Sequence, residues 1–408
     1  SSIAGWKGIE ASDMLLMPDP VTAHIDPFYE EPTVVLTCDV LEPGDGKAYE
    51  RDPRSLARRA EAYLKASGIG DTAFFGPEPE FFVFDGVRWS TEPGHSFYKI
   101  DEYEAPWNSG EKLEGGNRGH RPTVKGGYFP VPPVDSTHDM RAEMVLILEA
   151  MGIPVEVFHH EVAGAGQMEI NFLHGDPLGL ADKVFYFKRT LREAALKHDM
   201  YATFMAKPMA GEPGSAMHVH QSVVDADTGR NIFSNEDGSA SRLFHQYIGG
   251  LQRYMPSAMA VVAPYVNSYR RIVRHSAAPI NLQWGMDNRT VGFRVPVSGA
   301  QDRRIENRVI GADANPYLAL AVTLACGYLG MVEGCEPSPI VQGSAYNMPV
   351  ELPQGLPEAL NLLRGEASLR EVLGERFIDV YSAIKELEHQ EFMTVISPWE
   401  REHLLLHV

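Results

Sequence analysis

The sequence predicts an α+β fold whose sheet is mostly antiparallel. Two observations support this fold class. The chain has 408 residues, more than one compact domain usually holds, and 44% of them are hydrophobic, which is enough for a large core. Strand-like and helix-like segments follow one another without a regular β-α-β alternation, and this irregular order favours an antiparallel sheet with surrounding helices.

Residues 1–50 have the pattern of short strands and Pro-rich loops, as in Thr33–Val40 and the Gly- and Asp-containing turn after it. The pattern changes at Asp52, an N-cap residue that is followed directly by proline. We expect an amphipathic helix over 53–67, which Gly68 ends.

The other elements are predicted by residue periodicity. Apolar residues at helical spacing predict helices over Asp135–Met151, Leu178–His198, Ser241–Met255, Asn315–Gly330 and Arg376–Met393. Short runs of β-branched and aromatic residues predict strands over Ala73–Phe84, Val155–Glu161, Gln167–Phe172, Met217–Val224, Val291–Val297 and Arg304–Val309.

The composition excludes several classes of protein. A net charge of −19 disfavours nucleic acid as a partner, because phosphate binding needs clustered Lys and Arg. Three scattered cysteines indicate reduced thiols and a cytoplasmic protein. The most apolar stretch, Tyr317–Met331, is shorter than the roughly 20 residues of a membrane-spanning helix, so no membrane contact is expected. No signal peptide is visible, and because the chain starts at Ser1 without Met, we expect residues upstream of it.

Paired carboxylates on a strand are the first chemical signal. Glu78 and Glu80 are two residues apart, so both point to one face of the strand, and large apolar residues follow them directly. Two acids beside a core are costly unless a cation neutralises them, which favours a metal site. The alternative is an exposed strand edge whose prolines and acids prevent aggregation.

Further acids and histidines repeat this pattern. Glu161 and Glu169 flank a Gly-Ala-Gly turn, which should bring them together. His218 and His220 share one face of a strand, although a lone histidine is more often structural. In Arg304-Ile305-Glu306-Asn307-Arg308, alternation along a strand again places three charged side chains on one face. The alternative for this segment is an exposed row of ion pairs.

The whole set contains glutamates and histidines but no cysteine. Hard oxygen donors with at most one imidazole per ion select Mg²⁺ or Mn²⁺ over Zn²⁺ or Cu²⁺. Five arginines supply sites for phosphate and carboxylate, and metals combined with arginines suit phosphoryl transfer. These arginines are Arg271, Arg289, Arg294, Arg304 and Arg308. Neither GxxxxGK[ST] nor GxGxxG occurs, so ATP would be held in another way.

These motifs resemble those of the glutamine synthetase family, in the same order and over essentially the whole chain. The matching segments are Ser1–Gly8, Gly76–Phe82, Lys125–Pro130, Glu161–Glu169, Lys207–His220, Asn288-Arg289, Arg304–Arg308 and Asn315–Tyr317.

The resemblance implies a fold and an assembly. Residues 1–50 would be the remainder of an N-terminal β-grasp domain, and 51–408 a catalytic domain with a curved antiparallel sheet and surrounding helices. Members of the family form homo-oligomers, here expected as a dodecamer of two hexameric rings, with each active site between neighbours. The substrates would be L-glutamate, ATP and an amine or ammonium.

The resemblance also implies roles for individual residues. Metal ligands would be Glu80, Glu161 and Glu169 for the first ion and Glu78, His218 and Glu306 for the second. Substrate binding would involve Ser2, Tyr128, Gly214 and Arg271, and catalysis Glu161, Arg289 and Arg308. ATP contacts would be His220, Ser222, Arg294 and Arg304.

One departure from the family pattern bears on the substrate. A flap after Arg271 normally carries a glutamate that closes the ammonium site, and Ala277 takes its place here. The family's Asn-Gly-Ser-Gly also reads Pro213-Gly214-Ser215-Ala216. The flap and the sequence around Asp287-Asn288-Arg289 resemble those of the γ-glutamylputrescine or polyamine branch of the family. We therefore expect an ATP-dependent ligase for a polyamine or alkylamine.

Two alternatives stay open at this point: an authentic glutamine synthetase and a member that has lost catalysis. The presence of all six metal ligands argues against the second. Tyr346 lies where some relatives carry an adenylylated tyrosine, but its neighbours differ, so an ordinary loop tyrosine is the prediction.

Overall fold

The computed structural model describes residues 13–110, 119–274 and 276–408, and its centre is a nine-stranded sheet. The main order is β13-β14-β15-β11-β5-β9-β8, with β10 added to β5 and β12 to β11. The strands are β5 (Thr72–Phe84), β8 (Val155–His160), β9 (Gln167–Phe172), β10 (Tyr201–Thr203), β11 (Met217–Asp225), β12 (Arg230–Asn231), β13 (Trp284–Met286), β14 (Phe293–Val295) and β15 (Ile305–Asn307). Within this sheet β13 and β14 pair in parallel and the other pairs are antiparallel, which confirms the predicted fold class.

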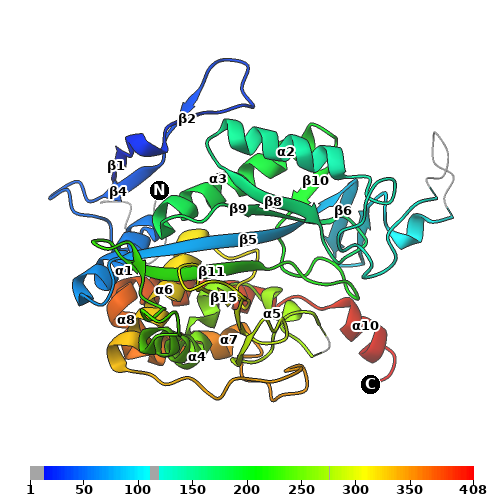
Figure 1. Cartoon of the computed structure of the whole chain (residues 1–408). Coiled ribbons are helices and arrows are strands. Elements are labelled where there is room, and N and C mark those ends of the chain that lie inside the picture. Colours follow the sequence, from blue (N-terminus) through cyan, green and yellow to red (C-terminus); the bar gives the residue numbers. More distant parts are fainter. Residues whose placement is uncertain (1–12, 111–118, 275) are drawn as a thin grey trace.

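Helices cover both sides of the sheet. In Figure 1, α2 and α3 lie above the strands, and α4, α6 and α7 lie below them. The helices are α1 (Pro53–Ser67), α2 (His138–Ala150), α3 (Pro177–Leu196), α4 (Arg242–Val262), α5 (Ser268–Arg271), α6 (Pro316–Glu333), α7 (Leu356–Gly365), α8 (Ala367–Leu373), α9 (Glu375–Phe392) and α10 (Pro398–Leu404).

The local signals placed some elements well and missed others. As predicted, the Asp52 side chain caps α1, and Gly68 ends it in the left-handed region at φ 68°. The helix predicted to end at Met255 continues through Pro256 to Val262, because its last turns are buried. The hairpin of β6 (Gly86–Glu92) and β7 (His95–Asp101) was not predicted, nor were α5, α7, α8 and α10.

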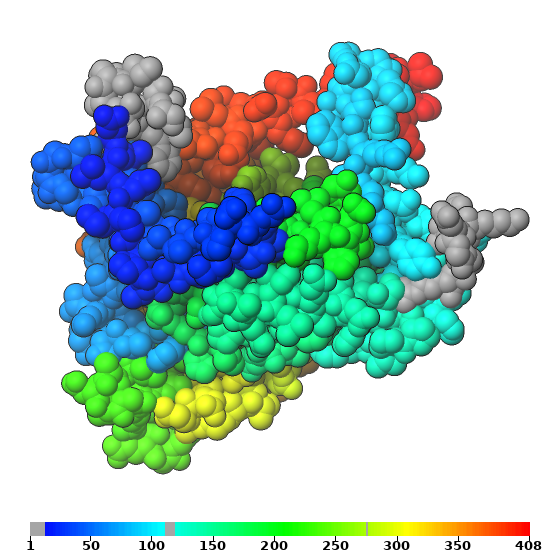
Figure 2. All heavy atoms as spheres, turned by 90° about the horizontal axis from the view of Figure 1, so that it is seen from above, coloured from blue at the N-terminus to red at the C-terminus, as the bar shows by residue number. Residues whose placement is uncertain are grey.

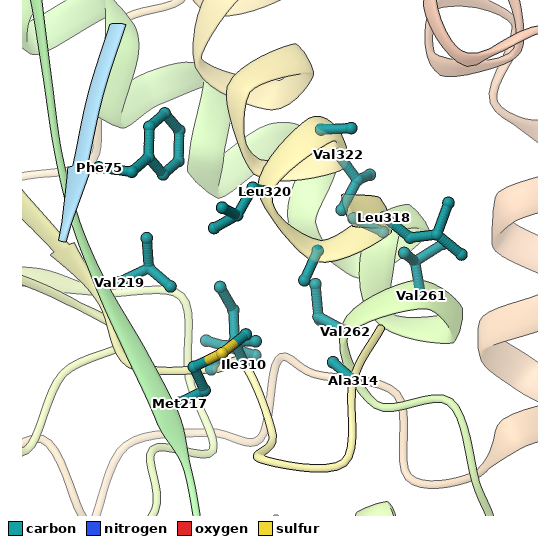
Figure 3. Packing of buried hydrophobic residues seen from close by; sticks show 14 of the residues in the cluster. Phe75, Met217, Val219, Val261, Val262, Ile310, Ala314, Leu318, Leu320 and Val322 are labelled. Atoms are coloured by element: carbon teal, nitrogen blue, oxygen red, sulfur yellow. The ribbon is translucent and has the colours of Figure 1, made fainter. Parts of the chain in front are cut away.

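The core lies between the sheet and the lower helices. Figure 3 shows Phe75 of β5 and Val219 of β11 facing Leu320 of α6, with Val262 of α4 nearby. Each such side chain contributes about 1.5–3 kcal/mol when fully buried. Among the described helices α6 alone is long and apolar enough to cross a membrane, and 83% of its apolar window is buried inside the protein. We assign it as a core helix.

The described N-terminal segment lies along α3. Its strands β1 (Leu15–Pro18) and β4 (Cys38–Leu41) pair with each other, as do β2 (His24–Ile25) and β3 (Val34–Val35). Figure 2 shows this segment in dark blue across the surface. Asp26 binds Arg189 of α3 at 2.7 Å, and the buried Arg54 of α1 binds Asp19 at 2.7 Å. These contacts fasten the segment to the larger part of the chain.

Candidate active site

Three antiparallel strands bring one group of acids and a histidine together. The register of β5 and β11 places Glu78 opposite His218, and that of β11 and β15 places His220 opposite Glu306. The ligand atoms of Glu78, His218 and Glu306 lie within 4.8 Å of one another. The His218 Nδ1 atom is 3.6 Å from Glu78 Oε2 and 3.8 Å from Glu306 Oε1. This is the set predicted for the second metal.

Cationic side chains of the chain itself neutralise this first group. Glu306 is 1% exposed, and its two oxygens accept from Arg294 at 2.6 Å and Arg308 at 2.5 Å. Burial opposes ionisation, but the Arg308 charge and the nearby histidines lower the pKa of Glu306 to about 2. Burial and Arg308 lower the pKa of His218 to about 4, so this imidazole is neutral and able to bind a metal at pH 7.

A second group lies at the junction of β5, β9 and β8. Glu80 pairs with Glu169 across the sheet, and His159 pairs with Glu169 on its other side. The ligand atoms of His159, Glu161 and Glu169 lie within 4.8 Å of one another. The His159 ring bridges the two carboxylates, at 3.6 Å from each.

Glu80 lies beside this second group, with its carboxylate engaged by other donors. Its Oε2 accepts from the Ala216 backbone N–H at 2.8 Å and from Gln167 Nε2 at 3.3 Å. Burial, with the charges of Glu161 and Glu169, raises the pKa of Glu80 well above its usual value. Burial, with the charges of Glu78 and Glu161, does the same for the pKa of Glu169.

Both groups suit divalent cations. Each offers carboxylate oxygens and one imidazole, the donor set of Mg²⁺ or Mn²⁺ rather than of thiophilic metals. The two groups are neighbours, because Glu78 and Glu80 lie two residues apart on β5 and Glu80 pairs with Glu169 of β9. All six predicted ligands therefore lie in one region, and the His159 ring, which was not predicted, lies among them. Its strand position, two residues before Glu161, was the available signal.

A cavity of about 820 Å³ opens next to the first group. Three of the four predicted ATP contacts line it, namely His220, Ser222 and Arg304. The fourth, Arg294, is not among the residues that line it; it binds Asp287 and Glu306, both at 2.6 Å. Glu156 also lines the cavity, at an irregularity in the register of β8, and was not predicted.

Two of the predicted substrate residues, Arg271 and Gly214, lie near Glu80, because Gln167 Nε2 donates both to Glu80 and to the Gly214 carbonyl. Arg271 is buried, donates to the carbonyls of Val309 and Arg308 at 2.9 Å each, and has its pKa lowered to about 10 by burial. A Cβ on Gly214 would lie 2.5 Å from the Ala206 carbonyl oxygen, so only glycine fits there.

The remaining predicted residues are placed as follows. Arg289 donates to the Tyr128 hydroxyl at 3.4 Å, so these two side chains lie side by side. Ser2 lies outside the described residues.

The flap that carries Ala277 has no acidic side chain. Positions 268–286 contain no Asp or Glu, and Ala277 itself is exposed. The Tyr346 hydroxyl donates to the Ala277 carbonyl oxygen at 3.4 Å. The loop of Tyr346 is anchored beside Arg289, because Asn288 Nδ2 donates to the Gly343 carbonyl at 2.7 Å.

Two family models match the sequence: glutamine synthetase, catalytic domain, over residues 50–404, and glutamine synthetase, β-grasp domain, over residues 1–43. A 3-hydroxylaminophenol mutase from Cupriavidus pinatubonensis is 47% identical, and a glutamine synthetase from Azotobacter vinelandii is 46% identical. Each comparison covers 98% of this chain and 88% of the relative.

A solved structure shows the same fold. The cryo-EM structure of Plasmodium falciparum glutamine synthetase superposes with a TM-score of 0.88 and 22% sequence identity, over 99% of this chain and 88% of that chain.

Proposed function

This chain belongs to the glutamine synthetase family and is a glutamate–amine or glutamate–ammonia ligase, and from this premise we propose that its amine substrate is a polyamine or another primary alkylamine. The flap carries this proposal, because Ala277 stands where the family pattern has a glutamate. Without that carboxylate, an ammonium site loses a charge-assisted hydrogen bond, about 1.5–3 kcal/mol. An alkylamine instead gains about 0.8 kcal/mol for each buried CH₂.

The proposed reaction has two steps. The γ-phosphoryl group of ATP moves to the γ-carboxylate of glutamate, which gives ADP and γ-glutamyl phosphate. The unprotonated amine then attacks the acyl carbon, the C–N bond forms, and inorganic phosphate leaves. Bound Mg²⁺ or Mn²⁺ at the two acid groups would neutralise charge on the phosphate oxygens.

Each side chain has a proposed part in these steps. Arg271 holds the α-carboxylate of glutamate, with Gly214, Tyr128 and Ser2 forming the walls of the substrate site. Arg289 and Arg308 face the transferred phosphate, and Glu161 accepts a proton from the amine. The ATP contacts are His220, Ser222, Arg294 and Arg304.

The test compares phosphate release from ATP and glutamate with ammonium, ethylamine, putrescine and spermidine. The proposal expects a higher kcat/KM for an alkylamine or polyamine than for ammonium. A clear preference for ammonium would contradict it.

Authentic glutamine synthetase is the second candidate. It is favoured by relatives of that name, such as those of Azotobacter vinelandii and Methylococcus capsulatus, at 46% and 48% identity. Preference for ammonium in the same assay would support it. Because one relative is named 3-hydroxylaminophenol mutase, the assay includes one control, in which the protein is incubated with 3-hydroxylaminophenol in the absence of ATP.

We also propose that the chain assembles into a homo-oligomer, a dodecamer of two hexameric rings. Residues 1–50 of one copy would complete the site of the next. Sedimentation with activity measured across the fractions tests this assembly. Activity confined to the large species supports it, and an active monomer contradicts it.

A further inference from the structure

A buried acid–histidine pair lies directly behind the second group. The side chains of Glu104 and His160 are both 0% exposed, and Glu104 Oε2 lies 2.9 Å from His160 Nε2. The other oxygen, Oε1, accepts from the backbone N–H and the hydroxyl of Ser136, each at 2.5 Å. The Glu104 carboxylate is therefore fixed from two sides, and it fixes one edge of the His160 ring.

The opposite edge of the ring holds two backbone carbonyls. His160 Nδ1 lies 2.8 Å from the carbonyl oxygen of Gly127 and 2.8 Å from that of Glu161. Both are acceptors, so Nδ1 carries a hydrogen and donates it to them. The orientation that Glu104 gives to the ring thus decides where these two carbonyls lie.

The first carbonyl belongs to the loop 125–129, which carries Tyr128. The Gly127 N–H donates to the Val162 carbonyl at 3.1 Å, and the Phe129 N–H donates to the His160 carbonyl at 3.3 Å. A Cβ on Gly127 would lie only 2.4 Å from the Glu161 carbonyl oxygen, so glycine permits this approach. The loop is therefore fastened to the end of β8 at His160.

The second carbonyl belongs to Glu161 itself. The Glu161 carboxylate accepts from the Val162 N–H, the next peptide along the chain, at 2.8 Å. Its position therefore follows the backbone of 161–162, which His160 holds through the Glu161 carbonyl.

From this chain of contacts we propose that Glu104 is a positioning residue for the amine half of the site, acting through His160 on Glu161 and Tyr128. The parts played by Glu161 and Tyr128 toward substrates rest on the proposed function. The effect of Glu104 on the geometry of the His159, Glu161 and Glu169 group does not rest on the proposed function. It can be measured by metal binding, without any turnover of substrate.

The experiment uses Glu104→Ala and Glu104→Gln in the full chain. Glu104→Ala removes the anchor of His160, and misplacement of a catalytic group by a fraction of an ångström lowers kcat by roughly tenfold or more. We expect the KM values for glutamate and amine to rise several-fold, with the KM for ATP changed less than twofold. Glu104→Gln, which can still bond to His160 and Ser136, should restore most of kcat. A purely structural role would lower thermal stability and leave all three KM values unchanged.

Mn²⁺ titration of the protein without substrates gives the independent readout. Glu104→Ala should weaken one class of Mn²⁺ site about tenfold, by the same displacement, and leave the other class unchanged. The inference would be overturned if the Mn²⁺ affinity of both classes of site stayed unchanged, or if both classes lost affinity equally. If the wild type binds Mn²⁺ but releases no phosphate with any amine or ammonium, the proposed function fails separately.

Two further variants keep the test decisive. Asp182→Asn alters another buried acid, on α3 beside Arg54 and Tyr317, and should leave KM and Mn²⁺ affinity unchanged. If Glu104→Ala does not fold, His160→Gln serves in its place, because its amide reaches Glu104 but not the Gly127 and Glu161 carbonyls. It should reproduce the loss, and a normal His160→Gln enzyme would overturn the inference.

Discussion

In the group of Glu78, His218 and Glu306, two arginines bind Glu306 directly, whereas no arginine of the described residues binds an acid of the group of His159, Glu161 and Glu169. Arg294 and Arg308 both contact Glu306, at 2.6 and 2.5 Å. In the described part of the chain, the ion-pair partner of Glu161 and Glu169 is His159 alone. The pKa of Glu306 accordingly falls, while burial and neighbouring acids raise the pKa of Glu169.

This contrast indicates different dependence on metal. The first group is electrostatically satisfied by the protein, so its geometry is set before any cation binds. The second group concentrates negative charge that no Lys or Arg pairs with in the described part of the chain, so a bound cation would neutralise it. The same substitution, Glu to Gln, should therefore have opposite effects on the stability of the metal-free protein in the two groups.

The largest effect is expected at the first group. Glu306→Gln leaves the buried Arg308 without its carboxylate partner and removes one of the two carboxylates that bind Arg294, which should lower the unfolding free energy by about 3–5 kcal/mol. Urea unfolding in EDTA measures this loss. The matched control is Asp287→Asn, which alters the exposed partner of Arg294 and should cost less than about 1 kcal/mol. Equal losses in the two variants would contradict the distinction.

The sequence predicted the acids of both groups, because alternation along a strand reveals which side chains share a face. Glu78 and Glu80 were found in this way, whereas Glu161 and Glu169 were predicted to meet because a Gly-Ala-Gly turn lies between them. What alternation cannot give is the register between strands. Arg294 reaches Glu306 because β14 pairs with β15 in one register.

His159 faces Glu169 through the pairing of β8 and β9, which alternation along one strand does not reveal, and its position two residues before Glu161 was the only signal for it in the sequence. The extension of α4 through Pro256 shows a second limit, because burial of Ser257–Val262 outweighs the helix-breaking signal of the proline. The role of Tyr346 and the domain boundary near residue 50 stay predictions.

The Glu104–His160 pair should make the stability of the protein depend on pH. Burial opposes ionisation, but hydrogen bonds from His160 and Ser136 lower the pKa of Glu104 to about 2, below its unfolded value near 4.5. A lowered acid pKa contributes stability that is present above the unfolded pKa and is lost as the pH falls toward the folded pKa. This contribution is on the order of 3 kcal/mol.

Glu104→Gln provides the measurement, because the amide does not titrate. The difference in unfolding free energy between wild type and variant should shrink between pH 5 and pH 3. A difference that stays constant over this range would show that Glu104 is not held as a carboxylate.

The flap offers a smaller effect on the amine side. Ala277→Glu restores an acceptor for ammonium, so the ratio of kcat/KM for alkylamine over ammonium should fall roughly tenfold, a change within the strength of one charge-assisted hydrogen bond. Ala277→Gln is the control, since it adds similar bulk without charge and should change the ratio less. No shift with Ala277→Glu would mean that the flap does not set specificity.

The smallest effect is expected for Glu169→Gln, and it has the opposite sign. In the metal-free protein this substitution removes a buried carboxylate whose pKa is raised by burial and by the charges of Glu78 and Glu161, so the unfolding free energy should rise slightly. With saturating Mn²⁺ the sign reverses, because the variant lacks a ligand and gains less from binding the ion. Thermal unfolding of wild type and Glu169→Gln, measured once in EDTA and once in Mn²⁺, gives the change in stability without and with the metal. If Glu169→Gln destabilised the metal-free chain as Glu306→Gln does, the second group would already be neutralised by the protein, and the contrast between the two halves would fail.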